Sequence, residues 1–103
     1  MTSGLRVSAI QLDILWENPN GNRLKINSLL PEKNSVDVVV LPEMFTTGFT
    51  TQSHSIAETM NGETVLWMQN IASTMNYAIA GSLIIEDNSK KYNRFIWALP
   101  DGS

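Results

Sequence analysis

The sequence of 103 residues contains no cysteine and a single histidine, His54. Without cysteine the chain cannot form a disulfide, a thiolate metal site or a cysteine nucleophile of its own. One histidine excludes a metal centre built from several histidines, and a Ser-His-Asp arrangement would have to use His54. These absences exclude several classes of metal centre. They also leave His54 as the only histidine that a serine-type catalytic triad could use.

Long hydrophobic runs and clusters of positive charge are also missing. No apolar stretch approaches the roughly 20 residues of a membrane-spanning helix, and residues 1–6 lack the apolar core of a secretory signal. Seven Lys and Arg against ten Asp and Glu give a net charge of −3, and the one basic pair is Lys90-Lys91. We therefore expect a cytoplasmic protein without a nucleic-acid or membrane surface.

Hydrophobic residues make up 43% of the sequence and charged residues 17%. A chain of this length buries about two thirds of the surface that it exposes when unfolded, so it holds one modest core. No internal repeat, low-complexity tract or linker divides it. The sequence thus predicts one domain, or part of one, over residues 1–103.

The first half of the sequence alternates between strand and helix patterns. An apolar period near two predicts a strand over 5–12 with at least one buried face. After a turn cluster at 18–21, apolar residues at helical spacing predict a helix over 22–30, which ends at Pro31 or continues a little past it. The run at 36–41 is almost continuously apolar, which is typical of a parallel strand buried on both faces. This order predicts a βαβ unit and an α/β fold.

A loop over 46–55, rich in Thr, Ser and Gly, separates this unit from the second half of the sequence. A second helix is predicted to begin near Asn61, which serves as its cap. Strand patterns at 77–85 and 92–99 surround a turn and predict an antiparallel hairpin. A further turn signal at 100–102 is followed by one residue, so we expect the chain to be the first part of a longer domain.

Glu43 follows the predicted strand at 36–41, directly after Pro42. Ligands in α/β sheets bind beyond the carboxyl ends of the strands, so this carboxylate stands where a functional acid or base is expected. Four apolar neighbours are expected to exclude water from it and so raise its pKa toward the range of a general base: Leu41, Met44, Phe45 and Phe49. The alternative from the residues alone is a glutamate that caps a nearby helix or turn.

Three stretches form a pattern that extends over the whole chain. The most specific is Leu41-Pro42-Glu43-Met44-Phe45-Thr46-Thr47-Gly48-Phe49. The others are Val7-Ser8-Ala9-Ile10-Gln11 and, later, Gly81-Ser82 followed by Tyr92-Asn93 and Asp101-Gly102. Together they resemble the nitrilase superfamily of carbon–nitrogen hydrolases, and most closely its omega-amidase-like branch.

The resemblance implies the amino-terminal part of a four-layer αββα sandwich and a Glu-Lys-Cys catalytic set. In that family a cysteine thiolate attacks the amide carbon, the glutamate takes the thiol proton, and the lysine stabilises the tetrahedral intermediate. Glu43 matches the glutamate, whereas the cysteine and the lysine have no match in this sequence. Lys90 and Lys91 are expected in a turn between two strands, as solvated charges.

The activity that the resemblance implies is hydrolysis of a non-peptide carbon–nitrogen bond through a cysteine thioester. The expected substrate is a small-molecule amide, the omega-amide of a dicarboxylic acid monoamide, and no metal or organic cofactor is implied. We expect the complete protein to form a homo-oligomer and the 103-residue chain alone to be inactive. The alternative is a non-catalytic α/β binding or interaction module.

Several residues near the expected site have more than one interpretation. Phe45 and Phe49 either line a substrate pocket or belong to the core. Asn93 either hydrogen-bonds near the site or ties down a strand edge. Gly81 is expected to permit close backbone approach rather than to contact substrate. His54 has no acidic partner at a telling spacing, which favours a loop histidine over a catalytic one.

Overall fold

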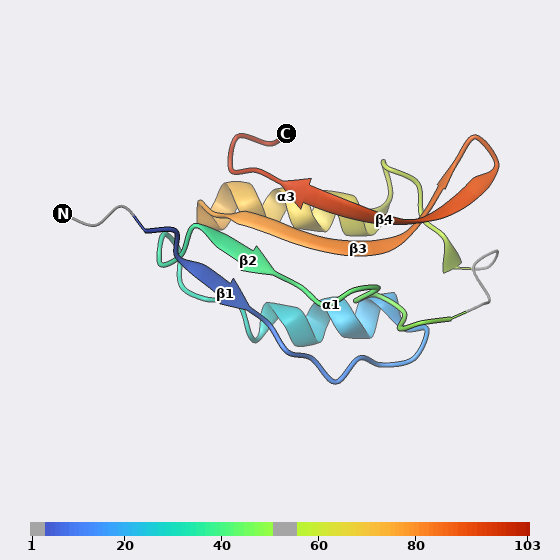
Figure 1. Ribbon diagram of the computed structural model, residues 1–103, viewed down its shortest axis with the longest axis horizontal. Helices are drawn as coiled ribbons and strands as arrows, with labels where there is room; N and C mark the ends of the chain where they lie inside the picture. Colours follow the sequence, from blue (N-terminus) through green and yellow to red (C-terminus); the bar gives the residue numbers. More distant parts are fainter. Residues whose placement is uncertain (1–3, 51–55) are drawn as a thin grey trace.

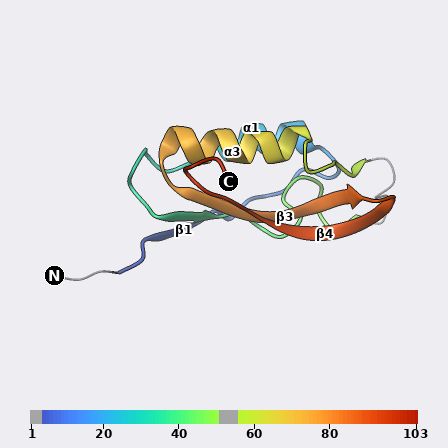
Figure 2. The ribbon, with the colours of Figure 1, turned by 90° about the horizontal axis from the view of Figure 1, so that it is seen from above.

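In the computed structural model, which describes residues 4–50 and 56–103, a four-stranded sheet carries two helices on one face (Figure 1; Figure 2). The strands lie in the order β1 (Val7–Ala9), β2 (Val38–Val40), β3 (Ala78–Asp87) and β4 (Lys90–Ala98). β1, β2 and β3 are parallel, and β4 is antiparallel to β3. The predicted βαβ unit and the predicted hairpin are confirmed.

Helix α1 (Pro19–Asn27) begins and ends three residues earlier than the sequence predicted. The Asn18 side chain accepts a hydrogen bond from the Gly21 amide at 3.0 Å, and Pro19 occupies the first helical position. Proline suits that position because its missing N–H would have no partner inside the helix. The residues interpreted as a turn cluster, 18–21, are therefore the cap and the first turn of α1.

Helix α3 (Glu63–Met75) has Gly62 at its cap position instead of the predicted Asn61. The carboxylate of Glu58, which precedes the helix, takes over the capping role. Its Oε1 accepts a hydrogen bond from the Thr64 amide at 2.8 Å, and its Oε2 accepts one from the Thr64 hydroxyl at 2.5 Å. The prediction of an Asn61 cap is wrong because a side chain three residues earlier, Glu58, accepts the hydrogen bonds of the first turn. No helix within residues 4–50 and 56–103 is long and apolar enough to cross a membrane.

The β3–β4 hairpin is longer than predicted and turns on two residues. Asn88 and Ser89 connect the strands with φ angles of 50° and 65°, as a tight hairpin turn requires. Lys90 and Lys91 therefore begin β4 rather than lying in the turn. Both are exposed, and Lys91 Nζ lies 3.6 Å from the carboxylate of Glu86 across the hairpin.

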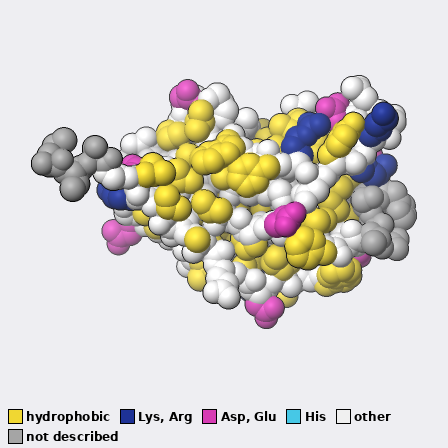
Figure 3. Space-filling model, in the orientation of Figure 1, with side chains coloured by type: hydrophobic (Ala, Val, Ile, Leu, Met, Phe, Trp, Pro, Cys, Tyr) yellow, Lys and Arg dark blue, Asp and Glu magenta, His cyan; other side chains and the backbone are white. Residues whose placement is uncertain are grey.

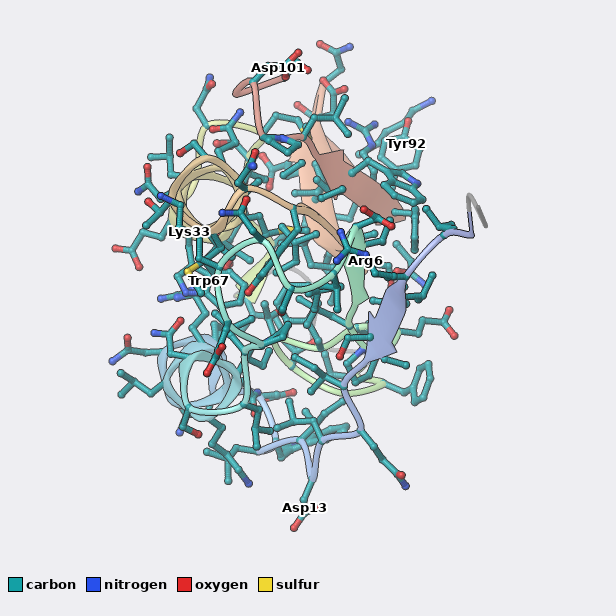
Figure 4. All side chains as sticks on the ribbon, turned by 90° about the vertical axis from the view of Figure 1, so that its left-hand side faces the viewer. Arg6, Asp13, Lys33, Trp67, Tyr92 and Asp101 are labelled. Atoms are coloured by element: carbon teal, nitrogen blue, oxygen red, sulfur yellow. The ribbon has the colours of Figure 1, made fainter. Side chains whose placement is uncertain are left out.

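The core lies between the sheet and the two helices. The strand register places six buried residues on the helix-covered face: Val39, Ile79, Leu83, Ile85, Ile96 and Ala98. The helices contribute further buried residues to the cluster: Ile26, Val65, Met68, Ile71 and Ala72. Figure 4 looks along the sheet and shows Trp67 between α1 and α3, where its Nε1 donates to Asn27 Oδ1 at 3.0 Å. The helices are thus joined to each other as well as to the sheet.

The opposite face of the sheet is covered by no element of the described residues (Figure 2). Phe95 and Trp97 of β4 lie on it, 54% and 52% exposed, with their ring centroids 6.0 Å apart. Figure 3 shows hydrophobic side chains gathered over this face. Val7 of the edge strand β1 shares the face and is also exposed. The expectation of a strand over 5–12 with at least one buried face is therefore wrong, because β1 has three residues, lies at the sheet edge and meets no second layer on this face.

We expect the 103-residue chain, produced alone, to associate or precipitate. An apolar sheet face and unpaired strand edges are surfaces that other chains bind. Sedimentation velocity over a tenfold concentration range should show a mean mass that rises with concentration. Replacing both Phe95 and Trp97 by lysine should reduce the association, whereas Leu24→Lys on the exposed side of α1 should not. A monomer at every concentration, with a cooperative thermal transition, would contradict this expectation.

Candidate active site

The loop that follows β2 is folded against β3. The Leu41 amide donates to the Ala80 carbonyl at 2.7 Å, which continues the β2–β3 pairing one residue beyond β2. The Met44 amide then donates to Ser82 Oγ at 2.9 Å, and the Phe45 amide donates to the Ser82 carbonyl at 3.3 Å. One residue of β3, Ser82, therefore holds two successive peptides of the loop.

The loop turns sharply at Met44, whose φ angle of 50° lies in the left-handed region. This conformation costs a non-glycine residue about 1 kcal/mol. The Met44 carbonyl accepts hydrogen bonds from the amides of Thr47 and Gly48, at 3.2 and 2.9 Å. Gly48, with φ at 78°, takes the second left-handed position. These contacts and those of Ser82 offset the local strain and fix the direction in which the chain leaves β2.

Glu43 lies in this loop, at the carboxyl end of β2. Asn93 Nδ2, on β4, donates a hydrogen bond to Glu43 Oε2 at 2.8 Å. Together with Leu41, Ser82 and Phe95, these two residues line a depression of about 290 Å³. The structure thus brings together the predicted carboxylate from the loop after β2, Ser82 from β3 and the predicted asparagine from β4.

The Glu43 carboxylate is exposed within the described part of the chain. Its neighbours Leu41 and Met44 are buried, at 4% and 8% exposure, and contribute to the interior rather than to a cover over the carboxylate. The sequence-based expectation that they would exclude water from Glu43 is therefore not met by residues 4–50 and 56–103. The depression opens on the same side of the sheet as Phe95, the side without a second layer.

Phe45 and Phe49 occupy different environments, and neither lines the depression. Phe45 is fully buried, with its ring centroid 5.9 Å from that of Trp67. A Cβ on Gly81 would lie 2.9 Å from the Phe45 ring and 2.9 Å from Leu41 Cβ, so this glycine permits the close approach that the sequence predicted. Phe49 is 71% exposed. Phe45 therefore lies in the core, which is one of the two positions that the sequence left open. A substrate contact by either ring stays a prediction.

Asn22 is a supporting residue that the sequence analysis missed. Its side chain is fully buried and bridges two loops: Nδ2 donates to the carbonyls of Leu15 and Thr46 at 2.8 and 2.7 Å, and Oδ1 accepts from the Leu15 amide at 2.7 Å. Thr46 belongs to the loop that carries Glu43, so Asn22 anchors that loop to α1. Helical spacing offered a signal, because Asn22 lies four residues before the buried Ile26.

The turn after β4 is formed as the sequence predicted. The Gly102 amide donates to the Leu99 carbonyl at 3.0 Å. The Ser103 hydroxyl and amide both donate to Asp101 Oδ1, at 2.5 and 2.9 Å, and these bonds hold the pKa of Asp101 below its ordinary value.

His54, which the sequence analysis interpreted as a loop histidine, lies outside the described residues.

A comparison with protein families agrees with the fold. The family model described as carbon–nitrogen hydrolase matches residues 6–103, which is nearly the whole chain. The chain therefore belongs to the carbon–nitrogen hydrolase family, and its sheet and helices form two layers of the four-layer αββα fold of that family.

Curated relatives refine the comparison. Omega-amidase YafV of Escherichia coli (strain K12) is 32% identical over 100 residues, which are 97% of this chain and 39% of that protein. The 2-oxoglutaramate amidase of Bacillus subtilis (strain 168) is 29% identical over 99 residues, 93% of this chain and 38% of that protein. The chain thus spans about two fifths of the length of the curated relatives it matches.

A solved structure shows the same arrangement. XC1258 from Xanthomonas campestris, described as a CN-hydrolase superfamily protein with an arsenic adduct in the active site, superposes with a TM-score of 0.92. It is 40% identical, and the match covers 96% of this chain and 38% of that one.

Proposed function

We propose that this chain supplies the general base, Glu43, of an amidase that hydrolyses the omega-amide of a small dicarboxylic acid monoamide. The observation that carries the proposal is the placement of Glu43, oriented by Asn93 at the carboxyl end of β2, in a chain that is similar to an omega-amidase over 97% of its length. Ligands of α/β sheets bind beyond the carboxyl ends of the parallel strands, so a carboxylate at this position can contact a bound substrate.

The proposed reaction proceeds through a cysteine thioester. Glu43 accepts the proton of a thiol, the thiolate sulfur bonds to the amide carbon, and a tetrahedral intermediate forms. The carbon–nitrogen bond then breaks, and the proton held by Glu43 passes to the departing ammonia. Water, deprotonated by the same carboxylate, hydrolyses the thioester and releases the dicarboxylic acid and the thiol. Glu43 therefore moves a proton in each half of the reaction.

The nucleophile and the oxyanion-stabilising lysine are proposed to come from outside these 103 residues. The sequence contains no cysteine, and Lys91 is engaged with Glu86 at the turn end of the hairpin. We propose that residues 1–103 form the first part of one catalytic domain, whose second sheet packs on the face that carries Phe95 and Trp97. That layer would also shield Glu43 from water, which strengthens its electrostatic interactions with the reacting groups.

We propose in addition that the complete protein is a homo-oligomer and is located in the cytoplasm.

Ammonia release tests this function. We expect the protein encoded by the complete reading frame around this chain to release ammonia from succinamate and glutaramate. Peptide amides of similar size should be much poorer substrates, and the 103-residue chain alone should release none. Failure of the complete protein to hydrolyse any small amide or nitrile, while it still binds omega-amides, would favour the non-catalytic binding module instead.

A further inference from the structure

The two oxygens of the Glu43 carboxylate have different surroundings. Oε2 accepts the hydrogen bond from Asn93 Nδ2 at 2.8 Å. Oε1 has no hydrogen-bond partner among residues 4–50 and 56–103. One oxygen of this side chain, which lines the depression, is therefore held by β4, while the other has no partner within the described residues.

Asn93 is well placed to hold a side chain because its own backbone is fixed. It lies within β4, opposite Ile84 in the ladder with β3, and both strands continue for several residues on either side. An asparagine has two side-chain torsions, so ordering it costs little conformational entropy. Functional groups held by rigid strands are located more accurately than groups held by loops.

The peptide that carries Glu43 is fixed from the same hairpin. The Met44 amide, which follows Glu43 directly, donates to Ser82 Oγ at 2.9 Å. Ser82 is 5% exposed and lies on β3, two ladder positions from the residue that pairs with Asn93. The hairpin thus contacts Glu43 at two points, one at the carboxylate and one at the backbone.

We propose, on the basis of the function proposed above, that Asn93 and Ser82 are positioning residues for the general base. Asn93 holds Oε2 so that Oε1 is presented to the proton donor, and Ser82 holds the left-handed turn at Met44 that directs the side chain toward the depression. A base must lie within hydrogen-bond reach of the proton that it accepts, and a displacement of about 1 Å can lower a rate about 10²-fold.

The decisive variant is Asn93→Asp in the protein from the complete reading frame. Aspartate has the same shape as asparagine, but it replaces the N–H donor by an oxygen, so that two carboxylates face each other. We expect kcat for succinamate to fall about 10²-fold with KM nearly unchanged, and Asn93→Ala to lower kcat about tenfold. A residue that only fills space would tolerate aspartate better than alanine.

Asn27→Asp is the matched control. Asn27 also makes one side-chain hydrogen bond between two elements, but there its Oδ1 accepts from Trp67, and aspartate preserves that acceptor. We expect this variant to keep kcat and the thermal midpoint close to those of the parent protein. A comparable loss in both aspartate variants would show a general effect of added charge and would overturn the role of Asn93.

Ser82→Ala tests the second contact without measuring activity. The Met44 amide would lose its acceptor, so its hydrogen exchange should become at least about tenfold faster, while amides in the middle of α3 stay protected. Unchanged exchange at Met44 would overturn the role of Ser82.

The outcomes separate this inference from the proposed function. If Glu43→Gln abolishes turnover but Asn93→Asp retains it, Glu43 is the base and the positioning role of Asn93 is wrong. If Glu43→Gln itself retains turnover, the proposed function is wrong regardless of the Asn93 variants.

Discussion

Replacing Glu43 by glutamine in the protein from the complete reading frame is expected to lower kcat for an omega-amide by at least about 10²-fold. A positioned general base contributes about 10² to 10⁴ in rate, or roughly 3 to 5 kcal/mol of activation free energy. Glutamine keeps the size of the side chain and an oxygen that can accept the Asn93 hydrogen bond, but it cannot take up a proton at neutral pH. The substitution therefore removes the proposed chemistry and preserves the contact.

The fold should survive this substitution because the Glu43 carboxylate is exposed and has one hydrogen bond within the described residues. The thermal midpoint of the variant should stay close to that of the parent protein. Glu32→Gln is a suitable control, since Glu32 is exposed in the segment before β2, away from the carboxyl end of that strand. Near-normal kcat in Glu43→Gln would show that Glu43 is not the base, and unfolding would show that it stabilises the loop.

The largest effect on stability is expected for Asn22→Ala. The variant leaves the Leu15 amide, the Leu15 carbonyl and the Thr46 carbonyl without their partner, and Thr46 is buried. An unpaired buried polar group costs about 1 to 3 kcal/mol, so we expect the free energy of unfolding to fall by about 3 to 5 kcal/mol. The total free energy of unfolding of a domain is about 5 to 15 kcal/mol, so the expected loss is a large fraction of it.

Urea denaturation of the complete protein measures this effect. Asn20→Ala is the matched control, because Asn20 lies in the same helix and is exposed. Exposed substitutions of this kind change stability by about 0.5 kcal/mol or less. Equal midpoints for the two variants would contradict the bridging role of Asn22, since water would then replace its three hydrogen bonds without cost.

The sequence predicted those features that depend on neighbouring residues along the chain. The apolar run before Pro42 indicated β2, and Glu43 was therefore expected at the carboxyl end of a strand, where the structure has it. The hairpin followed from two strand patterns around a short polar turn, and its two-residue connection at Asn88 and Ser89 has the backbone that such a turn needs. Local patterning was sufficient for these elements.

Features that depend on contacts between distant residues were missed. The cap of α3 comes from Glu58 rather than from Asn61, because the Glu58 carboxylate reaches the Thr64 amide. For Phe45 the sequence left a pocket and a core position open, and the structure has it in the core, where Gly81 on β3 leaves space for its ring. No local pattern encodes either contact.

The burial of the first strand was the other error. The strand pattern around Val7 predicted at least one buried face, yet Val7 is 53% exposed on the same uncovered face as Phe95 and Trp97. Alternation along a strand identifies the face but does not say whether another layer covers it. The same missing cover explains why the apolar neighbours of Glu43 do not exclude water from its carboxylate.

If Glu43 accepts the proton of a cysteine thiol, as proposed, the reactivity of that thiol depends on Glu43. Iodoacetamide alkylates the thiolate, so its rate of reaction with the nucleophilic cysteine of the complete protein, followed by peptide mass spectrometry, reports how far the thiol is deprotonated. At neutral pH we predict that Glu43→Gln reacts at least about tenfold more slowly than the parent protein, and that succinamate protects the parent cysteine. Equal alkylation rates in the two proteins would show that Glu43 does not deprotonate the thiol.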